Sequence, residues 1–340
     1  MTPASVTLKD LARELGVSPS TVSRALSNHP SISRERREQI QAHARQRQYR
    51  ANEMAAALRT SRTAHCNLIG VVLPEFQHYY FSCILTAIEE TLAAQGYLVL
   101  AAQTGDTCSR EREVLQSFRQ QKVAGIIMSQ AKDTKDYAHI QAAIDEGIPV
   151  VFVDRICTGV RTSRIVIDDY ATGYSATEHL IRSGCRRIAF LGTTMNLEIA
   201  KNRFNGYRDA IQKHGLPLDP RLVAECDNRE DAEQLTPILM QEEERPDAFF
   251  TINDDTALGV LYTCKRMGFR VPDDVSICGF GDGIRARSCE PRLTTMEQRG
   301  GEVGEQAALV MAATLSGEIP PGRFVNKIVK TKLIVRGTTK

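Results

Sequence analysis

The chain has 340 residues, and its composition of 42% hydrophobic and 25% charged residues is that of an ordinary globular protein. This length predicts two or three domains. No apolar run is long enough to cross a membrane and no secretory leader opens the chain, so we expect a cytoplasmic protein without a membrane partner.

Cysteine spacing and charge distribution indicate the kind of protein and its partners. The nine cysteines lie far apart with no CxxC pair, a pattern typical of reduced thiols, and we expect neither a bound metal nor a cofactor. The formal net charge is only +2, but residues 1–62 hold eleven Lys or Arg against five Asp or Glu. A basic segment beside a mildly acidic remainder indicates a nucleic-acid partner, although many basic faces are merely solvated.

Residues 1–50 predict three short helices. Thr7 and Asp10 have the spacing of a capping box, and the apolar residues that follow fall on one helical stripe. Gly16 should end this helix, and Ser18 should cap a second helix. A third helix is expected to open near Ser33. Two helices joined by a tight glycine turn make a helix-turn-helix.

The second of these helices carries short hydroxyl-bearing side chains and an arginine on its outward positions. Such side chains add little to helix stability, but they can reach phosphates and base edges in a major groove. The alternative is a polar surface helix in a small bundle. With the two N-caps, the predicted DNA contacts of this segment are Thr7, Ser18, Pro19, Ser20, Thr21, Ser23, Arg24 and Ser27.

The stretch "TLKDLARELGVSPSTVSRALSNHPSISRERREQI" closely resembles the DNA-binding head of the lac/galactose repressor (LacI/GalR) family. This resemblance implies that the helix after "GVS" is the recognition helix, with Pro19 and Ser20 at its most specificity-determining positions. Both residues are small, so we expect limited base reading at that end of the helix.

Residues 51–63 are predicted to form a hinge. Asn52 can cap a short helix, although an alanine-rich linker is an equally good interpretation of this stretch alone. The resemblance implies that the hinge helices of two subunits enter the minor groove, with Leu58 and Ala55 at the wedge positions.

From residue 64 to residue 340 the pattern is that of an α/β body. Eight short apolar runs alternate with amphipathic helical stretches, which predicts doubly wound parallel sheets in two subdomains. We expect one subdomain at about 64–160 and 293–322, and the other at about 161–292 and 323–340. The fold class is therefore a helix-turn-helix head followed by a body like a periplasmic binding protein.

Ligands of such sheets bind beyond the carboxyl ends of the strands, where this chain places aromatic and polar residues. The stretches "NRFNGYRDAI", "FFTINDDTALGVL", "DVSICGFGD" and "RLTTMEQ" resemble the family's effector domain, which is itself similar to periplasmic sugar-binding proteins. Strand-end position and this resemblance together predict effector contacts at Tyr80, Phe81, Gln130, Asp154, Arg203, Asn253 and Asp282.

One position departs from the family pattern. Where the family commonly has an acidic residue after "GF", this chain has Gly281, with Asp282 next. An effector that carries its own carboxylate, such as a sugar acid, could instead bind the guanidinium of Arg203.

These observations predict a sequence-specific transcriptional regulator controlled by a small sugar or sugar acid. It should bind a palindromic double-stranded operator as a homodimer, because one helix-turn-helix reads too few base pairs. The resemblance implies most often a repressor of carbohydrate-use genes. The alternatives are a sugar-binding protein without sequence-specific DNA reading and a sugar-modifying enzyme on the same fold. No motif pairs a nucleophile with a base, and "GFGDG" lacks the full spacing of a dinucleotide fingerprint, so we expect no enzyme.

Overall fold

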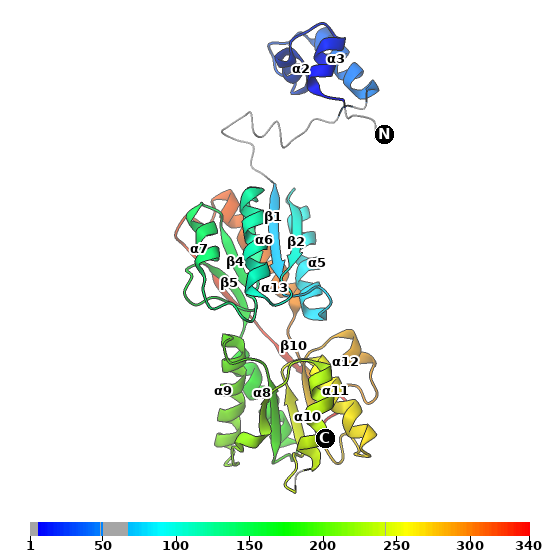
Figure 1. Cartoon of the computed structure of the whole chain (residues 1–340), viewed down its shortest axis with the longest axis vertical. Coiled ribbons are helices and arrows are strands. Elements are labelled where there is room, and N and C mark those ends of the chain that lie inside the picture. The colour runs from blue at the N-terminus through cyan, green and yellow to red at the C-terminus, as the bar shows by residue number, and fades with distance from the viewer. Residues whose placement is uncertain (1–5, 48, 50–66, 242) are drawn as a thin grey trace. The chain divides into compact units, whose positions relative to one another are not determined.

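The computed structural model describes residues 6–47, 49, 67–241 and 243–340. The chain divides into two compact units, residues 1–66 and residues 67–340. Figure 1 shows both units along the chain. None of the described helices is long and apolar enough to cross a membrane.

The described part of the first unit, called the head, contains three helices, α1 (Leu8–Glu14), α2 (Pro19–Leu26) and α3 (Arg34–Gln46). The predicted caps are present: the side chains of Thr7, Ser18 and Ser33 accept hydrogen bonds from backbone N–H groups in the first turns of α1, α2 and α3. Gly16 has a φ of 62°, the left-handed conformation that the turn between α1 and α2 requires. The head core is formed by Leu11, Ala12, Val22, Ala25, Ile40 and Ala44.

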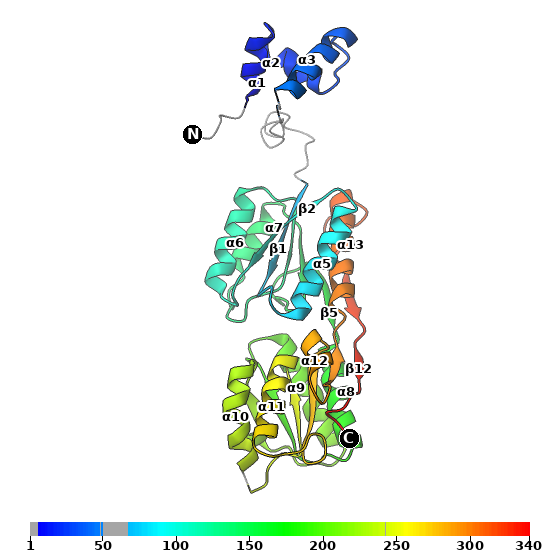
Figure 2. The ribbon, with the colours of Figure 1, turned by 90° about the vertical axis from the view of Figure 1, so that its right-hand side faces the viewer.

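The second unit, called the body, begins with a lobe built on a six-stranded parallel sheet in the order β11-β5-β4-β3-β1-β2. Its strands are β1 (Leu68–Leu73), β2 (Leu98–Gln103), β3 (Gly125–Met128), β4 (Val150–Val153), β5 (Ser163–Ile167) and β11 (Asn326–Val329). Its helices are α5 (Tyr79–Ala93), α6 (Cys108–Gln120), α7 (Ala138–Asp145) and α13 (Gly300–Ser316). Figure 2 shows α5 and α13 on one face of this sheet and α6 and α7 on the other.

The second lobe repeats this plan with the order β12-β10-β9-β8-β6-β7, in which only the β10–β12 pair among the described strands is antiparallel. Its strands are β6 (Ile188–Gly192), β7 (Val223–Glu225), β8 (Ala248–Thr251), β9 (Ser276–Gly281), β10 (Thr294–Glu297) and β12 (Lys332–Ile334). Its helices are α8 (Asp169–Arg182), α9 (Glu198–Lys213), the 3-10 turn η1 (Pro220–Leu222), α10 (Arg229–Gln241), α11 (Asp254–Arg266) and α12 (Ile284–Ser288).

The chain passes between the lobes three times, and the sheet order corrects the predicted subdomain boundaries. Residues 163–167 and 326–329 are strands of the first sheet, although they were predicted to lie in the second subdomain. Residues 294–297 were predicted in the first subdomain but form β10 of the second sheet. The boundaries shift because β10, β11 and β12 do not appear as apolar runs in the sequence. β5 does appear as one, but its pairing with β4 and β11, which assigns it to the first sheet, is not visible in the sequence.

Helices α8 and α9 pack closely against each other in the second lobe. Glycines make this approach possible: a Cβ at Gly206 would lie 2.6 Å from the backbone nitrogen of Tyr174, and one at Gly173 would lie 2.9 Å from Cα of Arg203. Both distances are shorter than carbon–backbone contacts allow, so the two backbones could not approach this closely if these residues had side chains. This packing fixes the position of Arg203, which lies on α9.

Candidate functional site

The outward face of α2 is the candidate DNA-binding surface of the head. Pro19, Ser20, Ser23 and Arg24 are exposed, while Val22 and Ala25 face the head core. Among the described residues, no hydrogen bond or ion pair involves the side chains of Ser20, Ser23 or Arg24. A helix whose exposed polar groups have no partner in the protein can offer all of them to phosphates and base edges.

The other predicted DNA contacts of the head already make hydrogen bonds within it. Thr7 Oγ1 donates to Asp10 at 2.6 Å, and Ser18 Oγ lies 2.9 Å from Thr21 Oγ1. Ser27 Oγ donates to the carbonyl of Arg24 at 3.2 Å. These residues therefore shape the ends of α1 and α2. The predicted hinge contacts Asn52, Ala55 and Leu58 lie outside the described residues.

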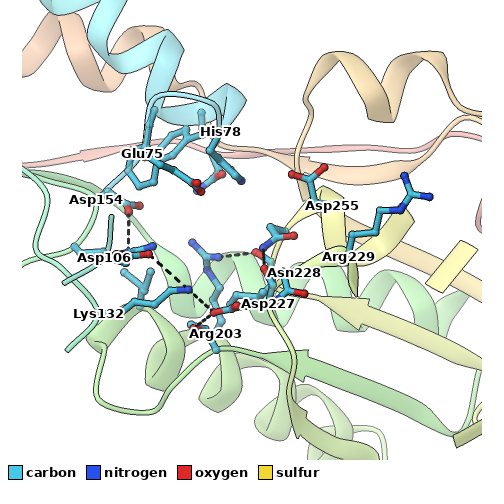
Figure 3. A pocket seen from close by; sticks show the side chains of 18 of the residues that line it. Glu75, His78, Asp106, Lys132, Asp154, Arg203, Asp227, Asn228, Arg229 and Asp255 are labelled. Carbon is cyan, nitrogen blue, oxygen red and sulfur yellow. Dashed lines mark hydrogen bonds and ion pairs between the residues drawn. The ribbon is translucent and has the colours of Figure 1, made fainter. Parts of the chain in front are cut away.

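The body contains a cavity of about 800 Å³ between the carboxyl ends of the two sheets. Loops after β1, β2, β3 and β4 line it from the first lobe, and loops after β6, β7 and β8 line it from the second (Figure 3). This is the position at which open parallel sheets bind ligands. The cavity has the size of a small-molecule site.

Five of the predicted effector contacts line this cavity and two do not. Tyr80, Phe81, Asp154, Arg203 and Asn253 are among its lining residues. Gln130 is instead buried beside the cavity, where its amide donates to the carbonyl of Thr134 at 2.9 Å. Asp282 lies outside the lining and pairs with Arg287 at 2.9 Å and with Arg336 at 2.6 Å. Both residues use their polar groups to hold loops, so their strand-end position does not bring them into the cavity.

Arg203 is held by the protein on two sides of its guanidinium. Its Nε donates to Asp169 at 2.7 Å, and its Nη1 donates to the carbonyl of Ile252 at 3.0 Å. The guanidinium carbon lies 3.6 Å from the centroid of the Phe280 ring. One N–H of Nη1 and both N–H groups of Nη2 remain, so a ligand carboxylate could approach only the edge of the guanidinium away from Asp169, and its charge is already balanced by that residue.

The Asp154 carboxyl and the Tyr80 hydroxyl are buried polar groups that form no hydrogen bond with any described residue. Asp154 is 5% exposed, and its nearest cationic atom, Arg155 Nε, is 3.8 Å away. Burial raises the pKa of the Asp154 carboxyl above its usual range, against the opposing effect of Arg155. The Tyr80 hydroxyl is buried and unpaired, and burial raises its pKa well above the ordinary value. Such groups lack partners that a ligand could supply.

An ion pair joins the two lobes inside the cavity, and sequence analysis missed it. Lys132 Nζ of the first lobe lies 2.7 Å from a carboxylate oxygen of Asp227 in the second, and both are labelled in Figure 3. Asp106 lies 3.6 Å from Lys132 and also pairs with Arg155. All three missed residues, Asp106, Lys132 and Asp227, follow a strand within a few positions. The signal was present, but β7 is only three residues long and was not predicted as a strand.

The departure at Gly281 has a local explanation. Its φ is 140°, a backbone conformation that residues with a side chain rarely adopt. A Cβ there would also lie 3.1 Å from a carboxylate oxygen of Asp254. The Asp254 carboxylate accepts hydrogen bonds from Thr295 Oγ1 at 2.6 Å and from the Gly283 nitrogen at 2.9 Å. The acidic group nearest to this position is therefore supplied by α11.

A second group of potential metal ligands lies outside the cavity. One atom each of Cys108, Glu111 and His139 fall within 4.8 Å of one another. The Glu111 carboxylate already accepts hydrogen bonds from the Ala131 nitrogen at 2.7 Å, from Thr134 Oγ1 at 2.9 Å and pairs with His139 at 2.8 Å. Through these bonds the buried carboxylate holds the loop after β3 in place, which accounts for its burial.

Comparison with known proteins gives the family of both units. The family model of bacterial regulatory proteins of the lacI family matches residues 7–52, and that of a periplasmic binding protein-like domain matches residues 177–339. The NTD biosynthesis operon regulator NtdR of Bacillus subtilis (strain 168) is 28% identical over 98% of this chain and 99% of its own length. The HTH-type transcriptional repressor CytR of Escherichia coli (strain K12) is 28% identical over 99% of this chain and 97% of its own length.

A solved structure shows the same fold over nearly the whole chain. The crystal structure of the lac repressor dimer bound to operator and the anti-inducer ONPF superposes with a TM-score of 0.82 at 24% identity. The superposition covers 98% of this chain and 99% of that chain.

Proposed function

We propose that the chain, a member of the lacI family of bacterial regulatory proteins, is a dimeric DNA-binding transcriptional regulator. In this proposal, a small molecule in the cavity of the body sets the affinity of the protein for its operator. One observation supports the DNA-reading role above others: the side chains of Ser20, Ser23 and Arg24 on α2 are exposed and have no partner in the part of the chain that the structure describes. The Ser18 cap and the Gly16 turn hold this helix in place. The protein is proposed to act in the cytoplasm, where the DNA is. The proposal includes no catalysed reaction.

The lobes supply a mechanism for control. An effector bound in the cavity lies beside the Lys132–Asp227 pair, so it changes how closely the two lobes approach at that point. We infer that this movement is passed to the head through the hinge. A coupling of about 1–3 kcal/mol would change operator affinity roughly 5- to 150-fold. The effector proposed here is a small molecule with several hydroxyl groups, such as a sugar, and the genes controlled are those for its use.

A genomic selection tests this function directly. The full-length protein is mixed with sheared DNA from its own genome at near-physiological salt, and the bound fragments are sequenced. Enrichment of one palindrome with half-sites about one helical turn apart is the expected result. Diffuse, strongly salt-dependent binding with no shared sequence would show that the head grips only phosphates and would overturn the proposal.

Arg24→Ala should weaken operator binding by about 1–3 kcal/mol, because an arginine that reads a base edge contributes about that much discrimination. Binding to unrelated DNA of the same length should change far less. Electrophoretic or fluorescence titration of both DNAs measures the two affinities. Arg110→Ala, which removes the same charge from α6 of the body, is the matched control and should leave both unchanged. Equal losses on operator and unrelated DNA would remove Arg24 from base reading.

The dimer interface is proposed to lie over β2 and α12. β2 is an edge strand of the first sheet, and an uncovered edge strand readily pairs with another chain. Leu98 on this strand is 71% exposed and Ile284 on α12 is 68% exposed. Figure 1 shows β2 and α12 on the same side of the body, and Figure 2 shows α5 between them on that side. An apolar surface of this kind is typical of an interface between copies of a chain.

The double variant Leu98→Asp/Ile284→Asp should be monomeric at micromolar concentration and should bind a palindromic operator at least about a hundredfold more weakly, since two half-sites would no longer be read together. Sedimentation velocity gives the mass and operator titration gives the affinity. Ile238→Asp on α10, at a residue that is 60% exposed, is the control and should remain dimeric. A double variant that stays dimeric would move the interface elsewhere.

A further inference from the structure

The charged groups that line the cavity are not balanced. The cationic side chains of the lining are Lys132, Arg155, Arg203, Arg229 and Arg285. The carboxylates of the lining are Glu75, Asp106, Asp154, Asp227, Glu230, Glu233 and Asp255. The lining therefore contains more carboxylates than cationic side chains.

Every one of these cations already has a carboxylate partner in the protein. The pairs are Lys132 with Asp227 at 2.7 Å, Arg155 with Asp106, Arg203 with Asp169 at 2.7 Å, Arg229 with Glu233 at 2.8 Å and Arg285 with Asp255 at 2.9 Å. An anionic ligand would have to compete with these carboxylates for a guanidinium or ammonium group. Each such exchange leaves a displaced carboxylate in or near the cavity without its partner.

Three carboxylates of the lining are not paired in this way. Glu75 and Glu230 form no ion pair with any described residue, and Asp154 approaches only Arg155, at 3.8 Å. Asp154 is also the most buried of the three, with a left-handed φ of 58° that fixes its direction at the end of β4. A buried carboxylate whose one ion pair is as long as 3.8 Å, and which makes no hydrogen bond to a described residue, is costly in the free protein, and a ligand cation reduces that cost.

The surroundings of Asp154 suit a hydroxylated ligand that carries a positive charge. The buried Tyr80 hydroxyl and His78 Nδ1 have no hydrogen-bond partner among the described residues, so a ligand hydroxyl that reached them would supply the partner that each lacks. The rings of Tyr80 and Phe81 lie with their centroids 5.6 Å apart and line the same wall, which offers aromatic faces to C–H groups and to a cation. Figure 3 shows Glu75 and His78 on one side of this space and Asp227 and Asn228 on the other.

We propose that the cavity binds a polyhydroxylated amine, a ligand of the amino-sugar class whose ammonium group pairs with Asp154, in preference to a neutral sugar or a sugar acid. The inference rests on the proposed function only in taking this cavity as the effector site. It replaces the sugar acid suggested by sequence, because the charge of Arg203 is already balanced by Asp169 and each other cation of the lining also has a carboxylate partner, which a ligand carboxylate would have to displace.

Three ligands of nearly equal size test the charge preference: glucosamine, glucose and glucuronate, each titrated calorimetrically into the full-length protein at a pH where the amine is protonated. Glucosamine should bind at least about tenfold more tightly than glucose, as expected for a charge-assisted hydrogen bond, and glucuronate should bind most weakly. The advantage of glucosamine should decline as the pH rises and the amine loses its proton. Equal affinities, tighter binding of glucuronate, or no binding of any of the three at 10 mM, about the limit of a weak specific site, would each overturn the proposal.

Two variants test whether the carboxylates of the cavity cause the preference for glucosamine over glucose. Asp154→Asn keeps the shape of the site, tolerates the left-handed φ and should make glucosamine and glucose bind equally. Glu230→Gln, at an exposed residue whose loss should not affect folding, should reduce the preference by a smaller factor. Glu89→Gln, an exposed residue of α5 outside the cavity, is the matched control and should retain it. Retention of the full preference in Asp154→Asn would overturn the assignment.

Different experimental results would contradict this inference and the proposed function. If glucose binds as well as glucosamine and alters operator affinity, the regulator stands and the charge preference falls. If no sequence is enriched in the genomic selection while glucosamine still binds preferentially, the ligand class stands and the regulatory role falls.

Discussion

Replacement of Arg203 by methionine should lower the free energy of unfolding of the body by about 3–5 kcal/mol at neutral pH. The guanidinium and its partner Asp169 are both nearly inaccessible, with side-chain exposures of 4% and 6%. Removal of the cation leaves a carboxylate buried beside α9 with no compensating charge, and this uncompensated charge is the source of the loss. Chemical denaturation of the two proteins, followed by circular dichroism, measures the difference.

The same variant should show a characteristic pH dependence. Burial raises the pKa of Asp169 to about 6, and the Arg203 guanidinium opposes this rise. Because this pKa lies above its ordinary value of 3.8, the carboxyl contributes stability at low pH that is lost as the pH rises through about 6. Without Arg203 the loss is larger, so the deficit of the variant should be greater at pH 7.5 than near pH 4, where the buried carboxyl is protonated in the folded state.

A second substitution provides the control for charge. Asp169→Asn combined with Arg203→Met replaces the ion pair by neutral groups of similar size and should recover most of the stability at neutral pH. A double variant as unstable as the sum of the two single variants would show that packing of the arginine stem, and not its charge, holds this region together.

Gly206→Ala should destabilise the body by about 3 kcal/mol, because the added methyl group overlaps the backbone of α8 at Tyr170 and Tyr174. The neighbouring groups are main-chain atoms of a packed helix, so no side-chain rotation relieves the overlap. The helices α8 and α9 must move apart, and Arg203 moves with them. The midpoint of thermal unfolding should fall by several degrees.

Gly301→Ala is the matched control for this prediction. Gly301 also lies in a helix, but it is exposed and a Cβ there would meet nothing within 4 Å. The substitution should stabilise the protein by about 0.5 kcal/mol, since alanine has less backbone freedom to lose on folding. If both substitutions have the same effect, the close approach of α8 and α9 is not what limits position 206.

The elements of this fold differ in how far sequence could predict them. The eight apolar strands, the three described helices of the head and their N-caps are local features, and each is present where the pattern placed it. β7, β10, β11 and β12 are three or four residues long, lack a continuous apolar run and are stabilised by their neighbours in the sheets, so no local pattern reveals them. The boundaries between lobes depended on these strands and were wrong for that reason.

The candidate site was predictable in location but less so in its charges. Strand ends correctly indicated the cavity and five of its lining residues. The partners of each charged group could not be predicted, because Asp169 and Arg203, or Lys132 and Asp227, are far apart in the chain and meet only after folding. These pairings decide whether a cation of the lining is available to a ligand, and they alter the expected class of effector.

The pairing of β5 with β11 sets a constraint on synthesis of the chain. Residues 163–167 remain an unpaired edge of the sheet until residues 326–329, more than 150 residues later in the chain, have been synthesised. At the rate of translation, about 5–20 residues per second, this interval lasts roughly ten seconds or more. The first lobe therefore cannot complete its sheet on the ribosome before the second lobe has been almost wholly synthesised. Chains that stop before residue 326 leave that edge open to other chains, so aggregation is their expected fate.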